Sequence, residues 1–422
     1  MEIILRFLEK YIIPKKLYAW GQPIYHYALA LLGAILFLFP SRKINVIAVT
    51  GTKGKTSVVE ITGAILEEAG FKVALSSTLR FKIGDKSERN MYKMTIPGRF
   101  FLQKFLRRAV RTKCQYAVVE MTSEGARQFR HKFIAFDALI FTNLAKEHIE
   151  SHGSYEKYVE AKLKIASALE KSKKKRKILV VNTDDAEASK FLMINIDEKY
   201  KYALNDAEPY TLLKEGLQMT IAGQTIKSKL SGKFNIYNML AALTYAKTQN
   251  IGPAIIKNAL EKFEGIRGRV ERIEEGQDFT VIVDYAHTPD SLEKLYEAFQ
   301  NQKKICVLGN TGGGRDKWKR EAMAEIAEKH CSEIILTNED PYDEDPRQIA
   351  EAMANAIKET PADIIMDRRE AINKALSSAG TGDAVLITGK GTDPFIMGPN
   401  GAKTPWDDAT VTREELKKIL KK

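Results

Sequence analysis

Residues 46–57 read VIAVTGTKGKTS, which joins an apolar, β-branched run to a glycine-rich segment and the start of a helical pattern. This order predicts a buried strand, a tight loop and a helix amino terminus. The backbone N–H groups of such a loop and the helix dipole bind phosphate. We expect Lys55 to reach the β- and γ-phosphates of a nucleotide, and the Thr56 hydroxyl to hold Mg²⁺. The other residues predicted to hold the nucleotide here are Gly51, Thr52, Lys53, Gly54 and Ser57.

The spacing of this loop is one residue shorter than that of the common P-loop. An ordinary glycine turn with a surface lysine is the alternative. A second acid supports the nucleotide site, because Glu120 ends the apolar run 116–119 and a carboxylate beside a P-loop strand commonly binds the metal of the nucleotide. Since P-loops serve ATPases, kinases and ligases, these residues leave the reaction open.

Alternating apolar runs and helical stretches follow Arg42 and predict an α/β fold with mostly parallel sheets. Residues 210–231 instead alternate with turn signals and predict a small antiparallel element. A second alternating region begins near Gly268. Strands are expected at 45–50, 116–120, 138–142, 178–182, 280–284, 304–308, 333–337 and 384–388, and helices at 56–69, 155–169 and 236–248.

These patterns divide the chain into three parts. Residues 1–41 form an apolar helical N-terminal segment, 42–265 a central P-loop domain that binds ATP, and 266–422 a Rossmann-like C-terminal α/β domain. In such open sheets ligands bind outside the carboxyl ends of the strands.

The amino-terminal segment carries no charged residue from Leu17 to Pro40. Pro23 and Pro40 bracket a helix of roughly 24 Å, which is short of a bilayer core of roughly 30 Å. Three interpretations stay open: a helix buried against the first sheet, a helix in the membrane interface, and a true span.

Composition narrows the class of partner. The chain has 422 residues, 44% of them apolar, and a net charge of +12, which favours anionic partners such as nucleotides or an anionic membrane. No nucleic-acid partner is expected. The dense basic run 171–177 reads as a solvated loop or a phosphate- or membrane-facing patch. Cys114, Cys306 and Cys331 show no paired or metal-ligand spacing, so a reducing, cytoplasmic setting is expected.

Several segments, in order, resemble the muramyl-tripeptide synthetases of the Mur ligase family. Besides the short P-loop they are 120–123, 142–144, 147–148, 161–162, 232–238, 268–271, 284–290, 312–320 and 389–391. The resemblance covers roughly Arg42 to the end. It implies a monomeric, ATP-dependent ligase that joins a muramyl-peptide carboxylate to an amino acid through an acyl-phosphate, at the inner face of the membrane if the apolar segment docks there. Folylpolyglutamate and cyanophycin synthetases share the P-loop and the lysine.

The resemblance also implies the catalytic metals. Thr56 and Glu120 would hold one Mg²⁺, and His148 matches a metal-ligand histidine of the family that would serve a second. Lys162 matches a lysine that CO₂ carbamoylates, which turns a cation into an anion able to hold metal or orient the γ-phosphate. Such chemistry needs a lysine kept partly neutral. The alternative from the residues alone is a solvated lysine in a charged helix.

Further roles are implied for substrate-binding residues. Asn143 and Asn235 match residues that hold the adenine, Arg269 one that reaches the phosphates, and Asp284 one that binds the ribose. The positions that match muramyl-peptide and amino-acid contacts are Thr95, Ser123, Gln128, Arg130, His287, Asp340, Lys390 and Asp393.

Departures from the family concern the substrates. Ile96 and Glu124 replace a threonine and a histidine of the family pattern. Tyr342 stands where diaminopimelate-adding members carry an arginine, so a lysine-like or other amino acid is expected, with Asp340 and Asp393 at its ammonium end. Full-length members carry about a hundred residues before the P-loop domain that grip the uridine nucleotide, whereas only some forty precede it here, which implies a truncated N-terminal domain.

Two other classes of function stay open from the sequence. A simple P-loop ATPase or kinase would account for Lys55, Thr56 and Glu120 but not for the later matches. A non-catalytic, membrane-associated partner of wall assembly would keep the fold without turnover.

Overall fold

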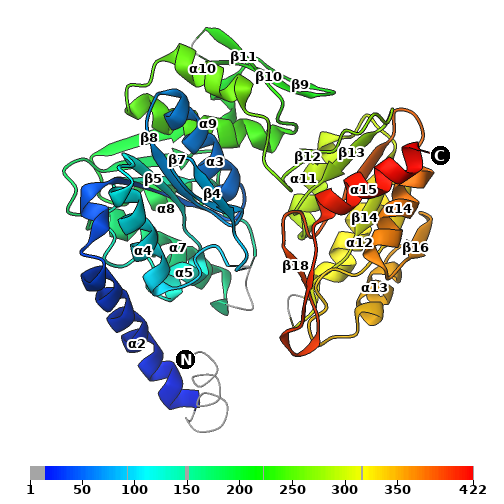
Figure 1. Ribbon diagram of the computed structural model, residues 1–422, viewed down its shortest axis with the longest axis horizontal. Helices are drawn as coiled ribbons and strands as arrows, with labels where there is room; N and C mark the ends of the chain where they lie inside the picture. Colours follow the sequence, from blue (N-terminus) through cyan, green and yellow to red (C-terminus); the bar gives the residue numbers. More distant parts are fainter. Residues whose placement is uncertain (1–14, 93, 148–151, 222, 315–316, 422) are drawn as a thin grey trace. The chain divides into compact units, whose positions relative to one another are not determined.

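The computed structural model describes residues 15–92, 94–147, 152–221, 223–314 and 317–421. The chain forms two compact units (Figure 1). The first contains residues up to 206 and 237–259, and the second contains 207–236 and 260–422. The chain passes between the units three times, after Asp206 and within helices α9 (Lys233–Thr248) and α10 (Pro253–Lys262). The three-part division expected above stays a proposal.

A single large sheet organises the first unit. Its strand order is β4-β3-β2-β5-β1-β6-β7-β8, parallel from β2 to β8 with an antiparallel edge at β3 and β4. The strands are β1 (Asn45–Thr50), β2 (Val73–Ser76), β3 (Arg80–Ile83), β4 (Lys86–Arg89), β5 (Tyr116–Glu120), β6 (Ala138–Phe141), β7 (Ile178–Asn182) and β8 (Glu198–Tyr202). Strand β1 lies between β5 and β6, with Val49 beside Glu120 and Thr50 beside Phe141. The residues after these three strands therefore meet at one edge.

Two helices of the first unit, α5 and α7, begin at a side-chain cap. Ser154 accepts a hydrogen bond from the Lys157 N–H at the start of α7, and Thr122 does the same for Gly125 at α5. The helices are α2 (Lys15–Leu36), α3 (Lys55–Glu68), α4 (Arg99–Arg111), α5 (Ser123–Arg127), α7 (Tyr155–Glu170) and α8 (Ala188–Leu192), with short 3₁₀ turns η1 (Pro40–Lys43) and η2 (Leu204–Ala207).

The sheet of the second unit has the order β12-β13-β17-β14-β15-β16 and is parallel except for β12. Alternate residues of its strands enter two separate apolar clusters, one on each face, as expected for a parallel sheet covered by helices. The strands are β12 (Glu271–Arg272), β13 (Thr280–Val283), β14 (Lys304–Leu308), β15 (Glu333–Leu336), β16 (Ala362–Ile364) and β17 (Ala384–Ile387). The helices are α11 (Pro289–Ala298), α12 (Lys319–His330), α13 (Pro346–Ala354), α14 (Arg368–Ser378) and α15 (Asp408–Leu420).

Two small elements complete this unit. Strands β9 (Tyr210–Leu213), β10 (Gly216–Ile221) and β11 (Gln224–Ser228) form the antiparallel element predicted from residues 210–231. Strands β18 (Phe395–Met397) and β19 (Lys403–Pro405) form a hairpin around the 3₁₀ turn η3 (Pro399–Gly401). The predicted α/β class with mostly parallel sheets is confirmed.

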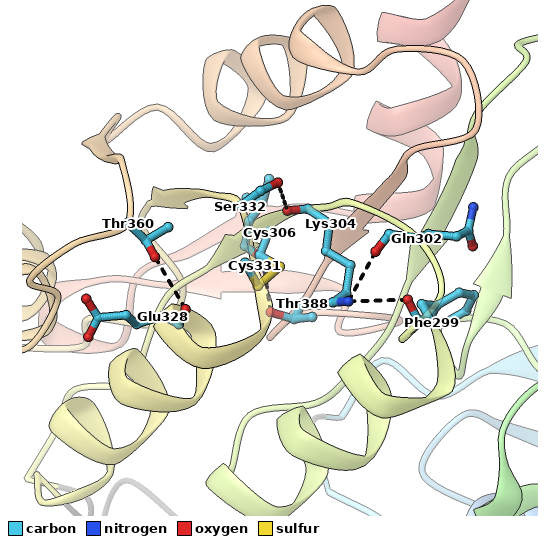
Figure 2. Close-up of a disulfide and its surroundings, with 10 residues drawn as sticks. Phe299, Gln302, Lys304, Cys306, Glu328, Cys331, Ser332, Thr360 and Thr388 are labelled. Atoms are coloured by element: carbon cyan, nitrogen blue, oxygen red, sulfur yellow. Dashed lines mark hydrogen bonds between the residues drawn. A yellow bond between two sulfur atoms is a disulfide. The ribbon is translucent and has the colours of Figure 1, made fainter.

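The cysteine prediction was wrong. Cys306 and Cys331 form a disulfide, although 25 positions separate them (Figure 2). Cys306 lies in β14, and Cys331 comes just before β15, the neighbouring strand, so strand pairing rather than sequence spacing brings them together. Cys114 is buried and free. The cysteine pattern therefore gives no support to a reducing setting.

The amino-terminal helix also differs from the prediction. Helix α2 contains Pro23 instead of beginning there. Among the described residues one face of it packs, against α4 and the rings of Phe129 and Phe133, so the buried-helix interpretation holds for that face alone. No helix of the described residues combines the length and apolarity that crossing a bilayer requires.

A buried histidine predicts a pH-dependent stability. Burial, followed by the charges of Lys132 and Lys164, lowers the pKa of His131 to about 3. Its Nδ1 atom has no hydrogen-bond partner among the described residues. Because the unfolded chain takes up this proton near pH 6.5 and the folded chain does not, stability is lost as pH falls from about 6.5 toward 3. We expect the histidine to remove about 2 kcal/mol at pH 5. Urea unfolding of His131→Phe should show a flatter pH profile; an unchanged profile would contradict this origin.

Candidate active site

Two glycines shape the loop between β1 and α3. Gly51 and Gly54 both have positive φ, at 150° and 80°, and Gly54 is the residue just before α3. A Cβ at Gly51 would collide with the Thr142 hydroxyl, and a Cβ at Gly54 with the Asn238 side chain. Only glycine fits this close approach of backbone to its neighbours. The loop thus delivers its backbone N–H groups to the amino terminus of α3, the arrangement that binds phosphate.

The segment after β6 holds the loop in place. The Asn143 side chain accepts from the Lys53 N–H at 2.9 Å and donates to the Lys53 carbonyl at 3.2 Å. The Thr142 hydroxyl donates to the same carbonyl at 2.7 Å, and the Thr52 N–H donates to the Asn143 carbonyl at 2.7 Å. These contacts fix the loop backbone without a ligand. The structure thus places the Asn143 amide on the loop; its expected adenine contact stays a prediction.

Lys55, Thr56 and Glu120 lie together at the carboxyl ends of β1 and β5. The Lys55 ammonium group donates to the Thr52 carbonyl at 2.8 Å, so it folds back over the loop. The Thr56 hydroxyl donates to Glu120 Oε2 at 2.9 Å, and the Glu120 carboxylate is buried. The backbone N–H of Thr78 donates to the same oxygen at 3.0 Å. A hydroxyl and a carboxylate in contact supply the oxygen ligands that Mg²⁺ prefers.

The residues of this site fit a magnesium ion that keeps ligands from outside the protein. Among the described residues no group of three or more His, Cys, Asp and Glu could hold a metal. Thr56 and Glu120 would therefore act with phosphate and water oxygens, which is typical of Mg²⁺ in nucleotide sites. His148 lies outside the described residues, so its metal role stays a prediction.

Lys162 is a fully buried lysine beside this loop. It comes from α7, and its Nζ atom donates to the Gly51 carbonyl at 2.6 Å and lies 4.9 Å from the Tyr158 ring centroid. Burial, followed by the charge of Lys55, holds the pKa of Lys162 well below its usual range, although Glu147 and Glu120 oppose this shift. Burial thus favours the neutral amine of Lys162, the form that carbamoylation needs.

The residues expected to hold the acceptor peptide make separate sets of contacts in the first unit. The Thr95 hydroxyl bonds to that of Thr78 at 2.8 Å, and Thr78 bonds to Glu120. The Arg130 guanidinium donates to the Ile96 carbonyl and, at 2.6 Å, to Gln128. Ser123 bonds to the buried His152 at 3.1 Å. Burial lowers the pKa of His152. Thr95 is thus linked through Thr78 to Glu120, and the other contacts are local.

The second unit gathers its predicted residues after β13 and β17. Asp284 accepts from the Val270 N–H at 2.7 Å and from the Ala286 N–H at 2.6 Å. The Arg269 guanidinium lies 4.3 Å from the ring centroid of Tyr285, and the Tyr285 carbonyl lies 2.6 Å from His287 Nδ1. Asn235 donates to the Ser231 carbonyl at 2.8 Å. Asp284 therefore fixes the turn that presents Arg269.

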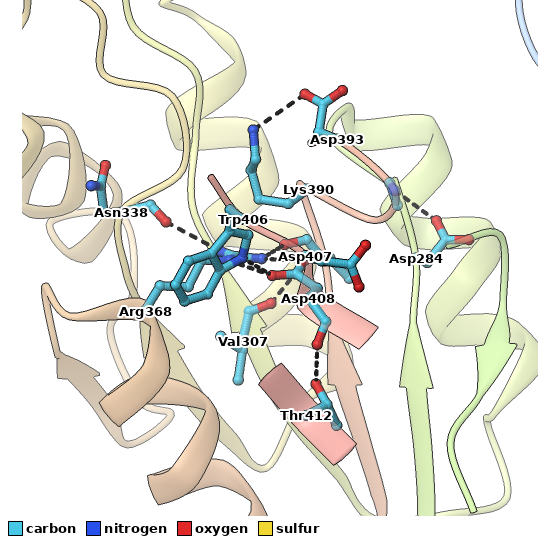
Figure 3. A network of polar contacts seen from close by, with 12 residues as sticks. Asp284, Val307, Asn338, Arg368, Lys390, Asp393, Trp406, Asp407, Asp408 and Thr412 are labelled. Atoms are coloured by element: carbon cyan, nitrogen blue, oxygen red, sulfur yellow. Dashed lines mark hydrogen bonds and ion pairs between the residues drawn. The ribbon is translucent and has the colours of Figure 1, made fainter. Parts of the chain in front are cut away.

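An acidic group surrounds Lys390. This buried lysine donates to Asp340 at 2.8 Å. It also donates to Asp393 at 3.2 Å (Figure 3). Glu339 is also buried; burial and then Asp340 raise the pKa of its carboxyl group, and Thr311 donates to it at 2.7 Å. Asp340 and Asp393 together outnumber Lys390 here, which suits a cationic substrate group.

Three residues of these sites were missed from the sequence. Tyr158 bonds to the Thr52 hydroxyl at 2.8 Å, and it precedes Lys162 by four positions, so helical spacing could have found it. Thr78 carries no signal of its own, because a serine- and threonine-rich turn after a strand is common. Glu339 directly precedes Asp340, but the sequence pattern gave it no role of its own.

Comparison with known proteins identifies the family. The chain matches the Mur ligase middle domain over residues 49–246 and the Mur ligase glutamate ligase domain over 268–391. It is 36% identical over 411 residues to the UDP-N-acetylmuramoyl-L-alanyl-D-glutamate–2,6-diaminopimelate ligase of Syntrophomonas wolfei, covering 93% of this chain and 82% of the relative. The chain belongs to the Mur ligase family. It is an ATP-dependent ligase that forms amide bonds.

Other relatives of this Mur ligase agree. The UDP-N-acetylmuramyl-tripeptide synthetase of a Roseiflexus species is 36% identical over 420 residues, covering 93% of this chain and 82% of the relative. A solved diaminopimelate ligase structure matches at a TM-score of 0.61 and 27% identity, over 89% of this chain and 79% of that chain. The folylpolyglutamate synthase of Mycobacterium tuberculosis, solved with ADP, matches at a TM-score of 0.70 and 17% identity, over 86% and 91%, which shows the shared fold.

Proposed function

We propose that this Mur ligase adds an amino acid to a UDP-muramyl-dipeptide-like carboxylate in peptidoglycan-precursor synthesis. The observation that supports this most is the Thr56–Glu120 pair beside Lys55 and the buried Lys162 on one phosphate-binding loop. The muramyl branch is preferred over a folylpolyglutamate synthase because the relatives at 36% identity carry muramyl-peptide names.

The chemistry follows from these positions. The γ-phosphoryl group of ATP passes to the substrate carboxylate and gives an acyl-phosphate and ADP. The amine then attacks the carbonyl carbon, phosphate leaves, and a proton is released. Lys55 and the N–H groups of the loop stabilise the phosphoryl oxygens during transfer. Mg²⁺ held by Thr56 and Glu120 would neutralise the charge that gathers there. The C-terminal residues Arg269 and Asp284 are proposed to contact the phosphates and the ribose, and Asn235 the adenine.

Lys162 is proposed to act as a carbamate. A neutral amine attacks CO₂, and loss of one proton leaves an anion where a cation would repel Lys55. The carbamate would orient Lys55, the γ-phosphate or a second Mg²⁺, to which His148 would also contribute.

This proposal predicts that Lys162→Ala lowers kcat about a hundredfold or more and that small carboxylates restore part of it. Labelling with ¹³C-bicarbonate gives a second readout. The NMR spectrum of the wild-type protein should gain one carbamate carbon signal, and that of Lys162→Ala should gain none. Lys164→Ala, on the same helix, should keep both the signal and the rate. A wild-type protein without the labelled signal would contradict the carbamate.

The amino acid added is proposed to end in an ammonium group. Asp340 and Asp393 are candidates to receive it. His287 and Lys390 match other substrate-contacting positions of the family and are proposed to belong to the same site. Tyr342 carries no cation for a distal carboxylate, which disfavours diaminopimelate, although several relatives are named for that substrate. A buried carboxylate that pairs with a substrate ammonium group gives selectivity, because a substrate without that group leaves the carboxylate unpaired.

Setting and assembly are also proposals. We infer a monomer in the cytoplasm, at the inner face of the membrane, that contacts the membrane through residues 17–40.

Phosphate release tests the reaction class. A ligase should release phosphate from ATP only when UDP-muramyl-dipeptide and an amino acid are both present, with lysine giving a higher kcat/KM than diaminopimelate. An ATPase needs neither substrate, a folate ligase needs a folate with glutamate, and a scaffold releases none. Any of these three results would overturn the proposal.

A further inference from the structure

Helix α2 is apolar on every side, yet among the described residues only one side of it is covered. His26, Ala30, Gly33 and Ala34 are buried on the face that packs toward α4. Positions three and four apart share a face of a helix, so these residues form one stripe. A helix that is apolar all round is normally buried in a core or in lipid. The opposite stripe of α2 therefore calls for a partner.

The open stripe is large. We name the exposed apolar side chains on this side of the segment the α2 face; each is between 40% and 63% exposed, and they are Ile24, Tyr25, Leu32, Ile35, Leu36 and Leu38. They are six of the sixteen exposed large apolar side chains in the described residues. Figure 1 shows α2 projecting beyond the sheet of its own unit. Scattered exposed apolar residues need no explanation, but a contiguous group marks an interaction site.

Basic residues flank the α2 face, and acids are missing. The sequence has no Asp or Glu from 10 to 59 or from 89 to 119. Lys104, Arg108 and Arg111 are exposed on α4, the helix that α2 packs against, and Arg42 and Lys43 are exposed in η1. None of these five forms an ion pair with another described residue within 4.0 Å. An apolar stripe beside such cations matches an anionic lipid surface, in which acyl chains lie next to a layer of negatively charged headgroups.

The length of the stripe favours a helix lying in the surface. From Ile24 to Leu36 the helix rises roughly 20 Å, which is less than the roughly 30 Å hydrocarbon core. A helix that packs along α4 on one face also cannot be surrounded by lipid.

We propose that the α2 face lies in the interface of an anionic phospholipid bilayer, with Lys104, Arg108 and Arg111 of α4 against the lipid phosphates. This names the lipid class and the contacting side chains for the membrane contact proposed above. It does not depend on the amide chemistry, because the α2 face contains no residue of the candidate active site.

Vesicle binding of the full chain tests the proposal. The protein is centrifuged with vesicles of phosphatidylcholine alone and of equal parts phosphatidylcholine and phosphatidylglycerol. We expect binding to the anionic vesicles that is at least about tenfold stronger than to the neutral ones and that weakens as salt is raised. Leu32→Glu with Ile35→Glu should lower the partition coefficient at least about tenfold. Lys104→Glu with Arg108→Glu and Arg111→Glu should lower it by a similar factor and remove the salt dependence.

Matched variants isolate the surface. Leu212→Glu with Leu213→Glu changes two exposed leucines of β9 by the same charge, and Lys171→Glu with Lys173→Glu and Lys175→Glu changes the other basic run by the same charge. Both should bind vesicles like wild type. An ATP-induced rise in Tm in every variant shows that each is folded.

Two results would overturn the proposal. One is equal vesicle binding by wild type and by Leu32→Glu with Ile35→Glu. The other is a dimer in the absence of lipid that this double variant dissociates, since a second copy would then cover the α2 face. Neither result bears on ligase activity, which the phosphate-release assay measures separately.

Discussion

Lys55→Ala should lower kcat about a thousandfold, because the Lys55 ammonium group is expected to stabilise the phosphoryl group as it leaves ATP. The loop backbone would stay in place, since Asn143 and Thr142 hold it independently of Lys55. ATP should therefore still raise the Tm of the variant. Phosphate release with both substrates present measures the loss.

Lys53→Ala is the matched control in the same loop. Its ammonium group lies 3.0 Å from the Glu147 carboxylate and forms an ion pair with it, whereas that of Lys55 donates to a carbonyl of the loop. The substitution leaves the buried Glu147 without this cation but keeps the Lys53 N–H in the loop, so kcat should fall by less than about tenfold. Equal losses in the two variants would show that loop charge in general, and not the position of Lys55, supports transfer.

Arg368→Met should lower the free energy of unfolding of the second unit by about 3–5 kcal/mol. The Arg368 guanidinium pairs with Asp408 at 2.7 Å, and both side chains are buried (Figure 3). It also donates to the Asn338 carbonyl at 3.2 Å and the Thr388 carbonyl at 2.7 Å, just after β15 and β17. Among the described residues, the substitution leaves the buried Asp408 carboxylate with the Trp406 N–H, which donates to it at 2.7 Å.

Two further variants separate the causes. Arg369→Met, one position along, removes a more exposed pair with Glu415 and should cost less than about 1 kcal/mol. Arg368→Met with Asp408→Leu removes both buried charges and should recover part of the loss. Urea unfolding measures all three. A loss in Arg368→Met no larger than that in Arg369→Met would contradict the buried-pair account.

The strands and the nucleotide loop could be predicted because local chemistry decides them. β-branched apolar runs gave strands 45–50, 116–120, 178–182 and 304–308 with the bounds that the structure has. The helix predicted at 155–169 is α7, one residue longer. The strand–loop–helix order around Lys55 also needs no distant residue. These features follow from side-chain shape and glycine, which a sequence displays.

Features that depend on distant parts of the chain could not be predicted. Lys162 reads as one lysine among several in a charged helix, and only its burial against the Gly51 carbonyl distinguishes it from Lys164. The Cys306–Cys331 disulfide depends on which strands are neighbours. The pairing of Asn143 with the Lys53 backbone likewise appears only when β6 lies beside β1.

Transfer of oxygen from the substrate carboxylate to phosphate tests the central claim most directly. The acceptor peptide is prepared with ¹⁸O in its reacting carboxylate, and the phosphate released during coupling is analysed by mass spectrometry. An acyl-phosphate predicts one ¹⁸O atom in each phosphate formed, because the bond that breaks when the amine attacks leaves the carboxylate oxygen on phosphorus. Coupled amide together with phosphate free of ¹⁸O would contradict it.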